Sequence, residues 1–241
     1  MRQTNFQVKH NEKIAENVFK MQLGGDISGI KAGQFVNILI DGLYLRRPIS
    51  VCDLQDDELT IVFKVVGKGT EKLAEAVPGD MLDTLVELGN GYDLGKDFEK
   101  PLLIGGGVGV PPLYLLAKRL IALGKTPTVI LGFNKQSEVF FEQEFKALGC
   151  DVRVVTVDGS YGARGFVTDV MDADYDYFFT CGPEPMLKAV YAKSKASGQF
   201  SFEERMGCGF GACMGCSCKT ITGYKRICKD GPIMFKEEIL W

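Results

Sequence analysis

The first hundred residues alternate short hydrophobic runs with polar turns. Four stretches show this alternation, residues 6–9, 18–21, 35–40 and 59–66. Clusters of Gly, Asp, Lys and Pro separate them, and such clusters are strong turn signals. Strand-length runs with a period of two and short connections predict a small antiparallel β-barrel over residues 1–99.

The pattern changes near residue 100. A short apolar strand at 101–104 runs into a glycine-rich segment, and helical spacing follows over 113–123. A strand, a glycine turn and a helix in this order are typical of a nucleotide-binding unit, because glycines let the main chain approach a pyrophosphate. The motif at 107–112 is G-x-G-x-x-P rather than G-x-G-x-x-G, so the dinucleotide interpretation depends on its context.

That context is a continued alternation of strands and helices. Strands separated by helical patterns predict a parallel sheet with helices on its faces, which we expect over residues 100–198. Ligands of such sheets bind at the carboxyl ends of the strands. The predicted strands are 128–133, 151–157 and 175–180, and the predicted helices are 142–148 and 187–196.

Asp158 directly follows the third predicted strand of this sheet. A carboxylate there can accept ribose hydroxyls and would repel a 2′-phosphate, which favours NAD over NADP. An aspartate before Gly159 and Ser160 is equally an ordinary turn residue. Both interpretations stay open at this point.

Composition limits the class of protein. The 241 residues suit two domains with a small appendage, and 46% hydrophobic with 24% charged residues is ordinary for a globular core. A net charge of −3 argues against nucleic-acid binding. No run approaches the roughly 18 apolar residues of a membrane helix, so we expect a soluble protein. The sole histidine, His10, argues against histidine acid–base chemistry.

The most specific motif lies near the C-terminus, in a segment we expect to form a cluster-binding module over residues 199–241. Cys208, Cys213 and Cys216 are spaced C-x4-C-x2-C, and Cys228 follows after eleven residues. This is the ligand spacing of a plant-type [2Fe-2S] cluster, in which each iron takes two thiolates. Three glycines permit the sharp turn that such a loop needs: Gly209, Gly211 and Gly215.

Two other uses of these cysteines compete with the cluster. Thiolate-rich sites also hold zinc, although structural zinc sites usually carry two short C-x2-4-C knuckles. Disulfides require an oxidising compartment, and residues 1–10 show no secretory signal. Cys218 falls outside the ligand spacing, and we interpret it as a bystander thiol.

Two segments of the predicted barrel have residues suited to phosphate. Arg46 to Ser50, which we place at the end of a strand, offers an arginine fork and a hydroxyl. Residues 67–70 precede a short predicted helix at 71–76, whose first amides can hold a phosphate oxygen. Together the two segments indicate a pyrophosphate.

These motifs together resemble a known superfamily. Arg47-Pro48-Ile49-Ser50, the glycine-rich segment 105–112 and Cys181-Gly182-Pro183 resemble the ferredoxin-NADP reductase superfamily. The segment 204–216, followed by Cys228-Lys229-Asp230-Gly231-Pro232, is similar to the family of electron-transfer subunits of dihydroorotate dehydrogenase B. The resemblance spans essentially the whole chain.

The resemblance implies three cofactor sites. The FAD site would comprise Arg47, Pro48, Ile49, Ser50, Val62, Phe63, Lys64, Gly69 and Thr70. Phe63 and Lys64 stand where the family pattern has tyrosine and arginine. The NAD site would comprise Gly105, Gly106, Gly107, Gly109, Cys181, Gly182 and Pro183. Cys181 would lie near the nicotinamide, although it is equally interpreted as a small buried hydrophobic residue. The cluster ligands would be Cys208, Cys213, Cys216 and Cys228.

The resemblance also implies an activity and a partner. An FMN-containing catalytic subunit would oxidise dihydroorotate in UMP biosynthesis, in a cytoplasmic heterotetramer with two copies of each chain. Electrons would pass through the [2Fe-2S] cluster and FAD of this chain to NAD. Two alternatives stay open: a reductase subunit serving a sulfide dehydrogenase or a hydrogenase, and a zinc-stabilised nucleotide-binding module without redox function.

Overall fold

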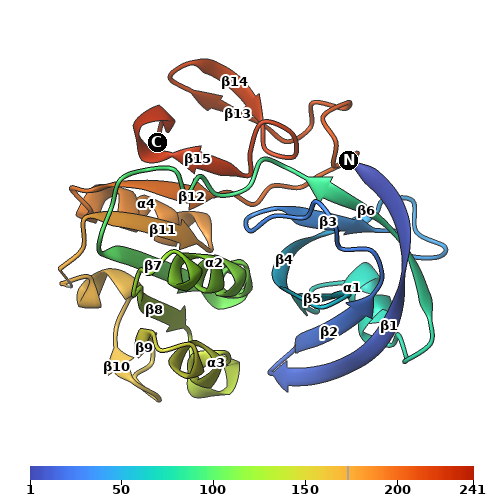
Figure 1. Cartoon of the computed structure of the whole chain (residues 1–241), viewed down its shortest axis with the longest axis horizontal. Helices are drawn as coiled ribbons and strands as arrows, with labels where there is room; N and C mark the ends of the chain where they lie inside the picture. The colour runs from blue at the N-terminus through green and yellow to red at the C-terminus, as the bar shows by residue number, and fades with distance from the viewer. Residues whose placement is uncertain (173) are drawn as a thin grey trace.

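The computed structural model describes residues 1–172 and 174–241. An antiparallel barrel and a mainly parallel sheet lie beside each other, and the C-terminal segment lies across both (Figure 1). This arrangement confirms the predicted order of a barrel, a nucleotide-binding sheet and a cysteine-rich C-terminal segment.

The barrel closes in the strand order β1-β2-β5-β4-β3-β6, with antiparallel pairing throughout. A short helix, α1, follows β5 and begins three residues earlier than the sequence predicts. Strand β6 was not predicted. The elements are β1 Arg2–Ala15, β2 Val18–Gly24, β3 Phe35–Ile38, β4 Arg47–Gln55, β5 Glu58–Lys64, α1 Lys68–Ala74 and β6 Met81–Leu88.

The second sheet has seven strands in the order β10-β9-β8-β7-β11-β12-β15. All neighbours pair in parallel except β15, which runs antiparallel to β12. Its strands are β7 Pro101–Gly106, β8 Thr128–Phe133, β9 Asp151–Thr156, β10 Ala163–Arg164, β11 Tyr177–Cys181, β12 Ser197–Ser201 and β15 Ile233–Phe235. Its helices are α2 Pro111–Ala122, α3 Glu142–Ala147 and α4 Glu184–Lys193.

The C-terminal segment contributes to this sheet as well as forming a hairpin of its own. Strand β12 contains the position 198/199, where we expected the nucleotide-binding domain to end. Strand β15, which follows the cysteine-rich loop in the chain, pairs with β12. The hairpin consists of β13 Ser217–Thr220 and β14 Gly223–Arg226. Short 3-10 turns are η1 Gly107–Gly109, η2 Gln136–Glu138, η3 Val167–Val170 and η4 Lys236–Glu238.

The cysteine-rich segment packs against the outer face of the barrel. Phe35 of β3 and Leu88 of β6 share one buried apolar cluster with Cys216, Ile227 and Cys228. Each large apolar side chain buried in this way contributes roughly 1.5–3 kcal/mol. The cysteine-rich segment therefore shares a buried apolar core with the barrel of this chain.

Hydrogen bonds from one connecting residue reinforce this packing. Asn90, in the connection from the barrel to the second sheet, donates from its main-chain N to Gly231 O at 2.7 Å. Its side chain donates to Ile233 O at 2.7 Å and accepts from Ile233 N at 3.1 Å. The interdomain connection and the C-terminal segment thus hold each other in place.

Within the described residues, no helix is both long enough and apolar enough to cross a membrane.

Candidate functional site

The barrel is split along part of the β4–β5 edge. Residues Arg47 to Ser50 of β4 pair with β3, but β4 pairs with β5 only from Val51 onward. Residues Val62 to Lys64 of β5 pair only with β2. The two segments that the sequence assigns to FAD are therefore the two sides of one seam, where main-chain groups lack a strand partner and are available to a ligand.

Arg47 and Arg46 have different roles in the structure. The Arg47 guanidinium lies so close to Gly69, in the first turn of α1, that a Cβ built at Gly69 would be 1.9 Å from Arg47 Nε. Arg46 instead donates to Asp83 Oδ1 and to Asp83 O, both at 2.9 Å. Arg47 is thus the arginine beside the helix N-terminus, and Arg46 braces the barrel. The Arg46 to Ser50 segment also lies at the beginning of β4, not at the end of a strand as expected.

Several predicted FAD residues present main chain rather than side chain to the seam. The Val62 and Phe63 side chains are both buried, on opposite faces of β5, and the Phe63 ring stacks on Phe19 at 5.9 Å. Thr70 Oγ1 accepts from Val66 N at 2.9 Å and donates to Gly67 O at 2.9 Å. Thr70 therefore shapes the loop before α1.

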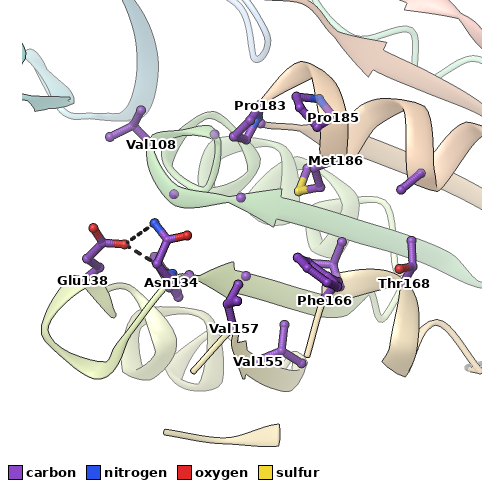
Figure 2. Close-up of a pocket in the computed structure, with 18 of the residues that line it drawn as sticks. Val108, Asn134, Glu138, Val155, Val157, Phe166, Thr168, Pro183, Pro185 and Met186 are labelled. Carbon is purple, nitrogen blue, oxygen red and sulfur yellow. Dashed lines mark hydrogen bonds between the residues drawn. The ribbon is translucent and has the colours of Figure 1, made fainter. Parts of the chain in front are cut away.

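A cleft of about 750 Å³ lies between the barrel and the carboxyl ends of β7, β8, β9 and β11. Its lining includes Gly106, Gly107, Gly109, Gly182 and Pro183 of the predicted NAD residues, together with Lys64 of the seam. Figure 2 shows Val108 and Pro183 on one side of this cleft and Val157 and Phe166 on another. The cleft thus borders the seam in the barrel.

The two glycine segments cross at main-chain contact. A Cβ at Gly109 would lie 2.3 Å from the Cys181 carbonyl oxygen and 2.6 Å from Gly182 Cα, so only glycine fits there. Gly107 has φ +53° and no neighbour within 4 Å of its Cβ position. Gly109 therefore allows the two loops to touch, and the space beside Gly107 is open.

Gly105 and Cys181 are not among the cleft residues. Gly105 packs beneath the loop against Val110 and Leu113. Cys181 is fully buried, and burial raises the pKa of its thiol well above the usual value. The cysteine is held as a neutral thiol beneath the cleft.

The cleft also contains several residues that no sequence motif indicated. Asn134 follows β8 and lies at the sheet edge where ligands bind, which the strand-end rule would have indicated. Phe166 is 63% exposed, unusual for an aromatic side chain, and lines the cleft beside Val157. Glu138 and Glu203 come from segments without a recognisable motif.

Asp158 follows β9 as expected, with its carboxylate engaged locally. Its Oδ1 accepts from Ser160 N at 2.9 Å and from Ser160 Oγ at 2.6 Å. These bonds lower the pKa of the Asp158 carboxyl and are those of an ordinary turn. Its charge still lies next to Val157, which lines the cleft.

The four predicted ligand cysteines affect one another in two pairs. Cys213 lowers the pKa of the Cys208 thiol, and Cys216 raises the pKa of the Cys228 thiol. All eight cysteines of the chain are free thiols. Among the described residues, no three Cys, His, Asp or Glu side chains are arranged around a single ion. Two thiol pairs in one loop region fit the donor set of a two-iron cluster.

Main-chain amides surround the first of these thiols. Cys208 Sγ accepts from Ala212 N at 3.2 Å and from Cys213 N at 3.4 Å. Burial raises the pKa of this thiol, but the main-chain donors outweigh burial and lower it below its usual value. Such amides stabilise a thiolate, the form that binds iron.

The loop conformation differs in one detail from the prediction. Gly209 and Gly211 adopt positive φ, at +78° and +92°, but Gly215 does not, and Met214 takes φ +61° instead. Gly215 is therefore not required for a left-handed conformation. Arg226 Nη1 donates to Gly211 O at 3.0 Å and ties the loop to β14.

Comparisons with known proteins find relatives of the C-terminal segment and of the whole chain. A family model described as the iron-sulfur cluster binding domain of dihydroorotate dehydrogenase B matches residues 203–240. The electron transfer subunit of dihydroorotate dehydrogenase B (NAD(+)) from Bacillus pumilus is 42% identical, covering 99% of this chain and 98% of the relative. The subunit of the same name from Fusobacterium nucleatum is 43% identical, with 96% of each chain covered.

Solved structures show the same architecture. A chain in the structure of an NADH-dependent reduced ferredoxin-NADP oxidoreductase has a TM-score of 0.90 and 31% identity, covering 98% of this chain and 90% of that chain. Phthalate dioxygenase reductase, at 19% identity and a TM-score of 0.68, shares the fold over 79% of this chain and 64% of that chain.

The fold and the site define a flavin-dependent reductase of the ferredoxin-reductase class with an iron–sulfur module at its C-terminus. Within that class, the chain belongs to the family of electron transfer subunits of dihydroorotate dehydrogenase B.

Proposed function

We propose that this chain is the electron-transfer subunit of an NAD-linked dihydroorotate dehydrogenase in pyrimidine biosynthesis. The observation that carries the proposal is the identity of 42% to named subunits over essentially the full length. A barrel seam, a nucleotide cleft and a four-thiol loop in one chain support it.

The bound groups would supply the redox chemistry, since an iron–sulfur cluster carries single electrons and a flavin exchanges a hydride with a nicotinamide. The chain's own residues position these groups. Cys208, Cys213, Cys216 and Cys228 would hold the cluster, and the amides of residues 212 and 213 would stabilise it through N–H···S bonds.

The FAD site would lie in the seam. Arg47 beside Gly69 would hold the pyrophosphate at the first turn of α1. The open strand edges of Pro48 to Ser50 and Val62 to Lys64 would hydrogen-bond the flavin ring, with Ser50 adding a hydroxyl. Thr70 would act through the loop that it shapes.

The NAD site would lie in the adjoining cleft. Gly106, Gly107 and Gly109 would let the dinucleotide approach the main chain before α2, and Gly182 with Pro183 would line the opposite loop. Cys181 would support that loop from below. Because the cleft borders the seam, the nicotinamide and the flavin can meet where Lys64 lies.

Substrate oxidation belongs, in this proposal, to an FMN-containing partner subunit in a heterotetramer of two copies of each chain. The only histidine, His10, lies on β1, with Nε2 at 3.5 Å from Glu12, and does not line the cleft. We also propose a cytoplasmic location, which the free thiols support because a reducing compartment preserves them.

We retain a division into three functional parts as a proposal: a flavin-binding barrel over residues 1–99, a nucleotide-binding part over 100–198 and a cluster-binding part over 199–241. The barrel and cleft residues support the first two parts. The match at 203–240 supports the third, although β12 and β15 pair with the second sheet.

Reconstitution tests the function. The chain loaded with FAD and iron is mixed with the FMN-containing catalytic subunit, dihydroorotate and NAD, and NADH formation is followed. We expect NADH only when both subunits are present, while the catalytic subunit alone reduces a dye. A complex with its full complement of cofactors that forms no NADH would refute the proposal.

A further inference from the structure

Asn37 is a buried polar residue on the outer face of barrel strand β3. Its neighbours Val36 and Ile38 point into the barrel core, whereas Phe35 faces the cysteine-rich segment. Alternation along a strand therefore directs Asn37 to the same outer face as Phe35. Its side chain is 1% exposed, and the C-terminal segment contacts it at Cys208 and Gly209.

This side chain touches the first proposed cluster ligand. Asn37 Nδ2 donates to the Cys208 carbonyl oxygen at 3.3 Å. The next residue, Gly209, lies so close that a Cβ there would be 2.4 Å from Asn37 Nδ2. The absence of a side chain at 209 is thus what allows the cysteine loop to rest on Asn37.

The carbonyl oxygen of the Asn37 side chain lowers the stability of the fold. Asn37 Oδ1 is buried and has no hydrogen-bond partner anywhere in residues 1–172 and 174–241. A buried polar atom left unpaired costs about 1–3 kcal/mol. The unpaired oxygen does not stabilise the fold, so the part of this side chain that does bond, the Nδ2 donor to Cys208, is the reason we give for an asparagine here.

Asn37 is also joined to the proposed flavin site. It pairs with Pro48 across the β3–β4 ladder, within the segment that forms one side of the seam. Its main-chain oxygen accepts from Arg46 Nη1 at 3.3 Å, and Arg46 is itself held by Asp83. One residue therefore links the Cys208 main chain directly to the strand that borders the flavin.

We propose that Asn37 is a positioning residue that sets the separation between the cluster and the flavin by fixing Cys208 and Gly209 on strand β3. The inference rests on the proposed cofactor sites and adds a residue that is neither a ligand nor a flavin contact. Electron exchange between two fixed centres falls steeply with their separation. A loop freed from Asn37 would therefore exchange electrons more slowly.

Anaerobic mixing of the loaded chain with NADH tests this without the partner subunit. NADH gives a hydride to the flavin and leaves as NAD+, which bleaches the flavin absorbance. One of the two electrons would then reduce one Fe3+ of the cluster to Fe2+, which appears in the cluster absorbance and the EPR signal, and the other electron would stay on the flavin. The first phase does not involve Asn37 and serves as an internal reference.

Asn37→Leu removes the donor and keeps the branched shape of the side chain, and Asn37→Ser shortens the side chain so that its donor no longer reaches Cys208. We expect flavin bleaching within about twofold of wild type, cluster reduction slowed at least about tenfold, and an altered cluster EPR line shape. Asn11→Leu is the matched control, because Asn11 Nδ2 also donates to main-chain carbonyls, of Ala74 and Ala76, and its Oδ1 also lacks a partner.

Each outcome bears on the proposal. If the Asn37 variants bind FAD but assemble no cluster while Asn11→Leu assembles it, Asn37 controls the placement of Cys208 and the proposal stands. An unchanged second phase in the Asn37 variants, or equal slowing in Asn11→Leu, would overturn it. If the wild-type chain binds neither flavin nor cluster, both the proposed function and this inference are overturned. If only the reconstitution with the catalytic subunit fails, the NADH experiment still tests the role of Asn37.

Discussion

Lys64 Nζ lies 3.3 Å from Glu138 Oε1, which joins the barrel to the second sheet across the nucleotide cleft. Lys64 ends β5 at the seam, and Glu138 ends η2, the turn after β8. Glu138 Oε2 also accepts from Asn134 N at 3.2 Å and from Asn134 Nδ2 at 2.9 Å (Figure 2). One carboxylate thus holds the loop after β8 and the end of β5 together.

Glu138→Gln should weaken this junction. The glutamine side chain keeps the shape of Glu138 but lacks the negative charge that Lys64 and Asn134 contact. Hydrogen bonds to charged groups contribute about 1.5–3 kcal/mol. We expect a melting temperature lowered by a few degrees and a KM for NADH raised several-fold in dye reduction. Glu144→Gln, in α3 and outside the cleft lining, is the control. Unchanged KM would show that the junction does not shape the cleft.

The same carboxylate predicts a pH dependence. Burial raises the pKa of Glu138, but the bonds from Asn134 and the charge of Lys64 outweigh burial, and the pKa lies below the ordinary value of 4.5. A lowered folded pKa gives stability above the unfolded pKa that is lost as pH falls through the folded pKa. The gap in unfolding free energy between wild type and Glu138→Gln should therefore shrink below about pH 4.5. A gap that is constant from pH 7 to pH 3.5 would contradict the assignment.

The cluster ligands can be separated from the bystander cysteine by substitution. Cys228→Ser should lose most of about two iron atoms per chain, because one iron loses a thiolate, while FAD remains bound. Cys218→Ser should keep both groups, since Cys218 lies outside the two thiol pairs. Iron analysis and the visible spectrum measure both outcomes. Equal iron content in the two variants would refute the ligand set.

Gly109→Ala should separate the two glycine loops. Its new methyl group would lie 2.3 Å from the Cys181 carbonyl oxygen, and main chain cannot yield cheaply. We expect a loss of about 1–3 kcal/mol in stability and a KM for NADH raised about tenfold or more. Gly149→Ala is the control, because it has positive φ and no near neighbour and lies just after α3. Gly149→Ala should lower stability and leave the KM for NADH unchanged. An equal KM in both variants would show that Gly109 does not belong to the proposed NAD site.

Asp158→Asn tests nucleotide selection without disturbing the turn. The amide oxygen can still accept from Ser160, so the variant removes the charge and keeps the local bonds. If the charge repels a 2′-phosphate, activity with NADPH relative to NADH should rise several-fold. An unchanged ratio would leave Asp158 as a turn residue.

Short-range features were predictable because their physical causes are local. The cysteine spacing indicates the cluster, since four thiolates must reach two irons within one loop and its return strand. The strand, glycine and helix order at 101–122 indicates the nucleotide unit, because the loop and helix start lie within one short segment. The barrel was predicted as a class, although β6 was missed.

The features that only the tertiary structure decided join residues that are far apart in the chain. The seam depends on where β4 stops pairing with β5, and no sequence period reports where a ladder ends. Arg46 and Arg47 look alike in sequence, and only their contacts with Asp83 and Gly69 separate a residue that braces the barrel from the proposed phosphate ligand. The bond from Asn37 to Cys208 spans 171 residues. The sequence by itself thus determined which cofactors this protein can hold, whereas folding decided how the sites face one another, because distance between sites is set by packing and not by local propensity.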